Sequence, residues 1–136
     1  MKFGAKSRTK SVAAVLVFWC VAVAHLTAQS KPAGTFTNPL ISFAKARTLP
    51  PEAPRFHQSD GMIKTSAAWL IERAGFGKGF GDGVAQLSSK HTLALTNRGG
   101  ATAADLLSLA REIRAGVQAK FGIELVPEPV LVGCEL

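Results

Sequence analysis

The longest helical pattern of hydrophobic and polar residues runs from Thr102 to Gly122. Thr102 and Asp105 form a Thr-x-x-Asp capping box at its start, and Gly122 offers a left-handed stop at its end. The apolar positions lie on one face: Leu106, Leu109, Ala110, Ile113, Val117 and Phe121. A stripe of this length predicts an amphipathic helix that packs against a core.

A shorter helix is predicted between Thr65 and Ala74. Thr65 or Ser66 can cap its start and Gly75 can end it. Its apolar face carries Ala67, Leu70, Ile71 and Ala74, and Trp69 is expected to be a packing anchor. The glycine-rich stretch 75–83 that follows predicts a flexible connection.

Several short stretches are rich in strand-forming residues. They predict an edge strand within Thr35–Ile41, a strand at His91–Thr96, and strand segments at Ile123–Val126 and Val130–Val132 separated by a break at Glu128. Phe43–Arg47 is predicted to form a single helical turn. Together these elements predict an α+β fold: a two-layer sandwich in which two main helices cover one face of a small mixed or antiparallel sheet.

The first 31 residues differ from the rest of the chain. Four basic residues within positions 1–10 precede an unbroken apolar run at 12–24, which is typical of a signal peptide. This run is too short to span a bilayer comfortably, so the membrane is a partner only if the leader is functional. The alternative is an unrelated start joined to a domain. We therefore predict a signal-like or non-native leader at 1–31 and a domain at 32–136.

The charge of the chain gives little support to nucleic-acid binding. The formal net charge is +7, but five of the 16 basic residues lie in residues 1–31, where there is no acid. The remaining 11 basic residues face nine acidic ones, so no basic surface is predicted and nucleic acid is not an expected partner. Cys20 and Cys134 are too far apart in sequence for a metal knuckle or redox pair, and no disulfide framework is predicted.

Spacing alone yields no catalytic motif. The stretch 75–83 (GFGKGFGDG) fits neither dinucleotide-binding nor P-loop patterns, and it follows a helix rather than a strand. His25, His57 and His91 lack metal-ligand spacing, so no metal site is predicted; His91 is either a surface residue or a ligand contact. Glu128 lies between two prolines, and this local rigidity suits either a positioned acid or a solvated turn residue.

Four separate blocks resemble one enzyme family. They are AGTFTNP (33–39), SAAWLIERAGFGKGF (66–80), SSKHTLALTNRGGATAADLLSLAREIR (88–114) and FGIELVPEPVLVG (121–133). In order and spacing they resemble the C-terminal, substrate-binding domain of UDP-N-acetylenolpyruvoylglucosamine reductase (MurB). The resemblance implies an oxidoreductase of peptidoglycan precursor synthesis. In that family NADPH reduces FAD, and the reduced flavin passes hydride to the enolpyruvyl double bond to make UDP-N-acetylmuramate.

The same resemblance assigns site residues. The family's general-acid serine corresponds to Thr35, in a motif one residue shorter, and its catalytic glutamate corresponds to Glu128. Asn38 matches a substrate-contacting asparagine, and His91 falls at a polar position on the substrate side. No residue of this chain is assigned to flavin binding, because residues 1–31 resemble no part of the family's FAD-binding domains.

Three functional hypotheses follow. The chain is a C-terminal fragment of the reductase that is inactive alone, a half that works with a separate FAD-binding chain, or a secreted or membrane-associated module that binds sugar or peptidoglycan without catalysis. In the first two, the expected ligand is a weakly bound UDP-sugar and the implied location is the cytoplasm. In the third, the leader directs the chain to the membrane or beyond it.

Overall fold

The computed structural model describes residues 35–129 and 136. The chain divides into two units, Met1–Lys31 and Pro32–Leu136, and every described residue belongs to the second. The predicted leader with its apolar run at 12–24 lies outside the described residues, as do both cysteines and the predicted strand at 130–132.

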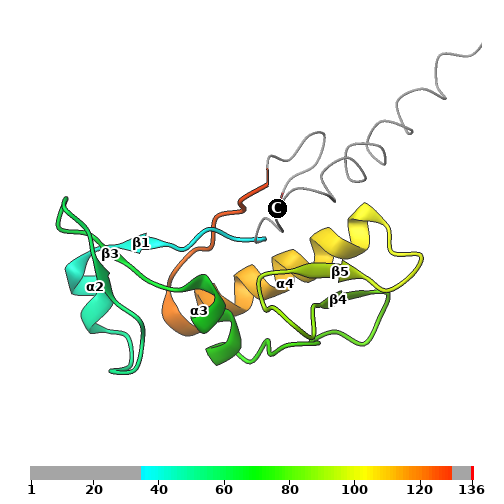
Figure 1. The fold of residues 1–136 in the computed structure, drawn as a ribbon, viewed down its shortest axis with the longest axis horizontal. Helices are drawn as coiled ribbons and strands as arrows, with labels where there is room; N and C mark the ends of the chain where they lie inside the picture. Colours follow the sequence, from blue (N-terminus) through cyan, green and yellow to red (C-terminus); the bar gives the residue numbers. More distant parts are fainter. Residues whose placement is uncertain (1–34, 130–135) are drawn as a thin grey trace, which may run out of the picture. The chain divides into compact units, whose positions relative to one another are not determined.

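The described residues form an α+β domain, which confirms the predicted class (Figure 1). The elements in chain order are β1 (Leu40–Ile41), α2 (Phe43–Arg47), β2 (Phe56–His57), β3 (Ile63–Lys64), α3 (Ala67–Arg73), β4 (Ala85–Leu87), β5 (Leu95–Asn97) and α4 (Ala103–Phe121). The strands form two separate antiparallel sheets, in the orders β1-β3-β2 and β4-β5.

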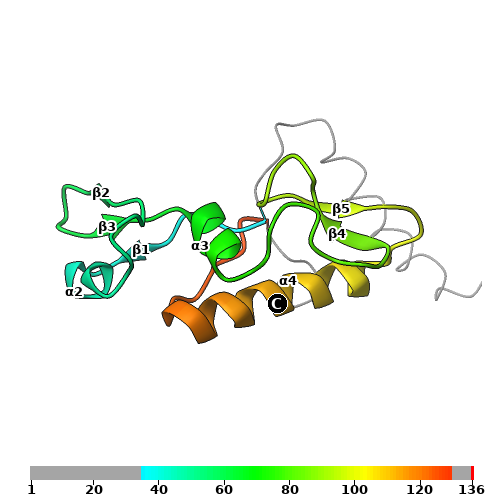
Figure 2. The same cartoon turned by 90° about the horizontal axis from the view of Figure 1, so that it is seen from below.

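Helix α4 is the scaffold of the core. Its capping box forms as predicted: Thr102 Oγ1 accepts the Asp105 N–H at 3.2 Å, and Asp105 Oδ2 accepts the Thr102 N–H at 2.8 Å. Gly122 ends the helix in the left-handed region, with φ at 60°. The buried face packs against α3, β4 and β5, which lie along it in both views (Figures 1 and 2). Its buried residues are Leu109, Ala110, Ile113 and Val117.

Helix α3 also matches its prediction. Ser66 Oγ accepts the Trp69 N–H at 3.2 Å, and Gly75 follows the C-cap with φ at 106°. Trp69 is partly buried against the core, with its ring centroid 5.8 Å from that of Phe121 on α4. The expected packing anchor therefore lies at the seam between the two main helices, although it is not fully enclosed.

Two of the predicted strands are wrong in extent or in kind. The stretch His91–Thr96 enters β5 only at Leu95, because His91–Ala94 closes a turn in which the Ala94 N–H donates to the His91 carbonyl at 3.1 Å. Ile123–Val126 forms no strand. The pairing next to it is an isolated bridge between Phe36 and Pro127, and Pro127 has no N–H to donate. The alternation of residues 123–126 instead buries Ile123 and Leu125 in the core.

The segment Thr35–Ile41 supplies an edge strand, as predicted. Only Leu40 and Ile41 are strand residues, and they pair with Lys64 and Ile63 of the central strand β3. On the other side of β3, Phe56 and His57 pair with the same two residues. The result is a small three-stranded sheet next to α2 (Figure 2).

Candidate functional site

The two predicted catalytic residues lie on segments that pair with each other. The Glu128 N–H donates to the Thr35 carbonyl at 3.1 Å, and the Thr37 N–H donates to the Val126 carbonyl at 2.9 Å. Between these bonds Phe36 forms an antiparallel bridge with Pro127, and its side chain is only 2% exposed. Burial of Phe36 therefore fixes the two segments side by side, even though 93 positions separate Thr35 from Glu128.

Thr35 also joins this pair of segments to the turn before β5. Its N–H and its hydroxyl both donate to the Leu93 carbonyl, at 2.6 and 2.8 Å. The hydroxyl proton is thus engaged within the protein, and only the lone pairs of Oγ1 are open to another donor. In this conformation Thr35 holds the two segments and the turn together.

His91 opens that turn and is exposed. Its Nδ1 accepts the Leu93 N–H at 3.1 Å, which leaves Nε2 as the ring atom open to a ligand. Thr92 is 3% exposed, and its hydroxyl donates to Glu72 Oε1 on α3 at 2.9 Å. The turn is therefore held by bonds to Thr35 and to Glu72. His91 lies two residues before Leu93, whose carbonyl accepts both bonds from Thr35.

Asn38 has a structural contact of its own. Its Oδ1 accepts the Ala67 N–H at 2.9 Å, one of the free amides in the first turn of α3. Asn38 follows Thr35 by three positions, which corresponds to a span of roughly 10 Å in an extended chain. The structure thus brings Thr35, Glu128 and the His91 turn into direct contact and places Asn38 one step further along the same segment.

Glu128 is the only one of the four whose side chain has no partner among the described residues. It is exposed, and the one ion pair formed within residues 35–129 joins Arg114 to Glu124. Its backbone is fixed by the bond to Thr35, so the free carboxylate starts from a fixed position.

Sequence reasoning missed an exposed cation on the sheet that continues from Asn38. Lys64 lies in β3 directly opposite Leu40, which follows Asn38 by two residues. Leu40 and Phe56, the two cross-strand neighbours of Lys64, are 55% and 57% exposed, so this row faces outward. A pair of strands separated by the Asp60-Gly61 turn signal was the feature that could have placed Lys64 on an exposed sheet face.

Within the described residues no three side chains of the His, Cys, Asp and Glu types come together as a metal site. No helix in that part of the chain is both long and apolar enough to cross a bilayer. The groups that the site offers to a polar ligand are the Glu128 carboxylate, Nε2 of His91 and the amide of Asn38.

Comparison with known proteins identifies the fold family. The family model for the C-terminal domain of UDP-N-acetylenolpyruvoylglucosamine reductase matches residues 26–132. The chain belongs to this family. The predicted resemblance to the reductase's C-terminal domain is therefore confirmed.

Relatives of this reductase domain are closely similar in sequence. UDP-N-acetylenolpyruvoylglucosamine reductase of Thermobifida fusca is 58% identical over 118 residues, which cover 79% of this chain and 33% of that protein. The reductase of Saccharopolyspora erythraea is 58% identical over 113 residues, covering 74% of this chain and 31% of that protein. The chain thus spans about a third of the length of the relatives it matches. The roles of Thr35, Asn38, His91 and Glu128 stay predictions.

Proposed function

We propose that this chain provides the substrate-binding side of a UDP-N-acetylenolpyruvoylglucosamine reductase. The observation that carries the proposal is the pairing of residues 35–37 with 126–128, since it joins the two positions that correspond to the family's acid and glutamate. The remaining two thirds of the relatives' length have no counterpart in these residues, and the flavin chemistry is expected to reside there.

Glu128 is the residue we expect to act on the substrate. Its carboxylate is exposed and has no partner in the described part of the chain, whereas the Thr35 proton is already donated to the Leu93 carbonyl. Thr35 must break that bond before it can protonate a substrate carbon, and its β-branched side chain has few alternative rotamers. We therefore propose Glu128 as the main catalytic group of this chain and Thr35 as a weak acid at best.

We propose that the UDP-sugar lies along residues 35–40 and is held by polar groups on both sides of that segment. Lys64 offers an ammonium to the diphosphate, His91 offers Nε2, and Asn38 offers its amide N–H₂ while its oxygen caps α3. A half-pocket of this kind binds weakly, because it lacks the wall that a second domain supplies. FAD and NADPH, the cofactors of the family, are proposed to bind to a separate FAD-binding part and not to these residues.

Reconstitution tests the proposal. The Thermobifida fusca reductase, truncated to remove the third that this chain matches, would be mixed with the full chain, FAD, NADPH and enolpyruvyl substrate. We expect NADPH oxidation that depends on both proteins and on substrate, that is strongly reduced by Glu128→Ala, and that is unchanged by Glu112→Ala on the exposed face of α4.

This chain by itself should be colourless and should not oxidise NADPH. A flavin spectrum in the purified chain, or substrate-dependent oxidation without the second protein, would contradict the assignment. The alternative of a secreted or membrane-associated sugar-binding module depends on residues 1–31, which lie outside the described residues, and it stays a prediction together with the location of the protein.

A further inference from the structure

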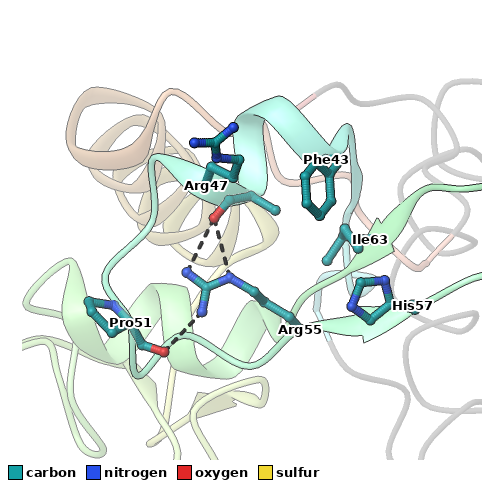
Figure 3. A pocket seen from close by; sticks show the side chains of 7 residues that line it. Phe43, Arg47, Pro51, Arg55, His57 and Ile63 are labelled. Carbon is teal, nitrogen blue, oxygen red and sulfur yellow. Dashed lines mark hydrogen bonds between the residues drawn. The ribbon is translucent and has the colours of Figure 1, made fainter.

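A pocket of about 450 Å³ lies between α2 and the hairpin of β2 and β3 (Figure 3). Its lining residues are Phe43, Ala46, Arg47, Pro51, Arg55, His57 and Ile63. His57 and Ile63 are cross-strand partners, while the exposed Lys64 pairs with Phe56. Since successive strand residues point to opposite faces, this pocket and the Lys64 row lie on opposite faces of the sheet. Its volume is typical of sites for small molecules.

The floor of the pocket is apolar and its wall is aromatic. Ile63 and Ala46 are 1% and 2% exposed, so the floor is part of the core. Phe43 starts α2 and is 56% exposed, which is unusual for a large apolar side chain. Figure 3 shows the rings of Phe43 and His57 on either side of Ile63. A planar ligand can therefore contact both ring surfaces while covering Ile63.

Arg55 holds the opposite wall in place. Its guanidinium donates to five backbone carbonyls at 2.9–3.3 Å, two of them marked in Figure 3: Ala46, Leu49, Pro50, Pro51 and Ala53. All of its N–H groups are thus used inside the protein, and none is left to bind a ligand directly. The positive charge of Arg55 is not paired with a carboxylate among the residues that the structure describes.

Arg47 and His57 provide the open polar groups. Both are exposed, and neither side chain forms a hydrogen bond or ion pair within the described residues. No aspartate or glutamate lines the pocket, so Arg47 and Arg55 make it positively charged. An arginine fork binds a carboxylate through two parallel N–H···O bonds, and the imidazole of His57 can donate a third.

We propose that this pocket binds a planar aromatic carboxylate. The aromatic part covers Ile63 between Phe43 and His57, and the carboxylate reaches Arg47 at the rim. Charge complementarity selects the anion, and the apolar floor selects the ring. The site lies on the other face of the sheet from Lys64, so it does not depend on the proposed reductase function.

A titration of the full, ¹⁵N-labelled chain with 2-naphthoate and with its neutral counterpart 2-naphthamide tests the proposal. Amide shifts should cluster at Phe43, Arg47, His57 and Ile63, and naphthoate should bind about tenfold more tightly than the amide, as expected for a charge-assisted pair. Arg47→Gln should reduce that difference several-fold, because it removes the arginine fork while the charge of Arg55 stays. Lys78→Gln, which removes the same charge from the glycine-rich loop, should leave it intact.

Three results would overturn the proposal. They are the absence of shifts at millimolar naphthoate, equal affinity for naphthoate and naphthamide, and a naphthoate preference that Arg47→Gln leaves unchanged. Shifts confined to Asn38, Lys64 and Glu128 would also reject it, because they would place the anion at the proposed substrate site instead.

Discussion

Gly116 in α4 is expected to be sensitive to substitution because of one aromatic ring. A Cβ built at this position would lie 2.3 Å from Cε2 and 2.4 Å from Cζ of Phe76. Ordinary contacts are more than 1 Å longer, so Gly116→Ala must displace either the ring or the helix. Phe76 in turn packs edge-to-face on Phe80 at 4.8 Å between ring centroids, which limits how far it can turn.

The size of the effect follows from two opposing contributions. Overpacking costs about 1–3 kcal/mol, and the overlap seen for Gly116→Ala places it near the upper end. Replacing glycine by alanine inside a helix otherwise raises the free energy of unfolding by about 1 kcal/mol. We therefore expect Gly116→Ala to lower the free energy of unfolding by roughly 1–2 kcal/mol.

The background Phe76→Ala should reverse the sign. Without the ring, only the helix contribution remains, and adding Gly116→Ala should stabilise the protein by about 0.5–1 kcal/mol. Urea denaturation followed by circular dichroism measures all four proteins of this cycle. Gly83→Ala is the matched control: nothing lies within 4 Å of a Cβ there, so its effect should be below about 0.5 kcal/mol. If Gly116→Ala is equally destabilising with and without the ring, the steric explanation is refuted.

Three further predictions concern the clamp that Arg55 forms on the loop carbonyls, the buried Phe36 and the cap of α4. Arg55→Lys cannot reproduce the planar set of bonds to the loop carbonyls and should cost about 1–3 kcal/mol in urea denaturation; an unchanged stability would refute the clamp. Phe36→Ala, at a position 2% exposed, should cost about 3–5 kcal/mol, and unaltered amide shifts at Glu128 would show that the ring does not hold the paired segments. Hydrogen bonds from the Thr102 side chain and backbone lower the pKa of Asp105 below its ordinary 3.8. The stability that Asp105 adds over Asp105→Asn should therefore be present above pH 3.8 and be lost as pH falls through the lower folded-state value, whereas a difference independent of pH down to acid unfolding would contradict it.

Helices were predictable because their signals are local. The capping box of Thr102 and Asp105 and the stop at Gly122 lie within 21 residues of each other, and each forms the bonds that its sequence indicates. The strands have two or three residues each, too few for alternation to be distinguished from chance. The turn at His91 formed because its own ring accepts the Leu93 N–H, an interaction that competes with strand geometry.

The site was predictable only in part. Resemblance named Thr35 and Glu128, and the structure joins their backbones. No pattern in the sequence indicates that the Thr35 hydroxyl donates to Leu93, because 58 positions separate the two. The pocket beside α2 was missed for a different reason. The bonds of Arg55 that hold its wall reach carbonyls only two to nine positions away, but the loop carries no motif that indicates them.

Binding of the enolpyruvyl UDP-sugar to the labelled full chain tests the central claim most directly. We expect amide shifts at Thr35, Asn38, His91 and Glu128, with an affinity between high micromolar and millimolar, equivalent to about 4–6 kcal/mol. Glu128→Ala should abolish them, while Glu112→Ala should not. No shifts at millimolar ligand, or shifts confined to residues 75–83, would contradict the claim that this domain keeps the substrate side of the reductase.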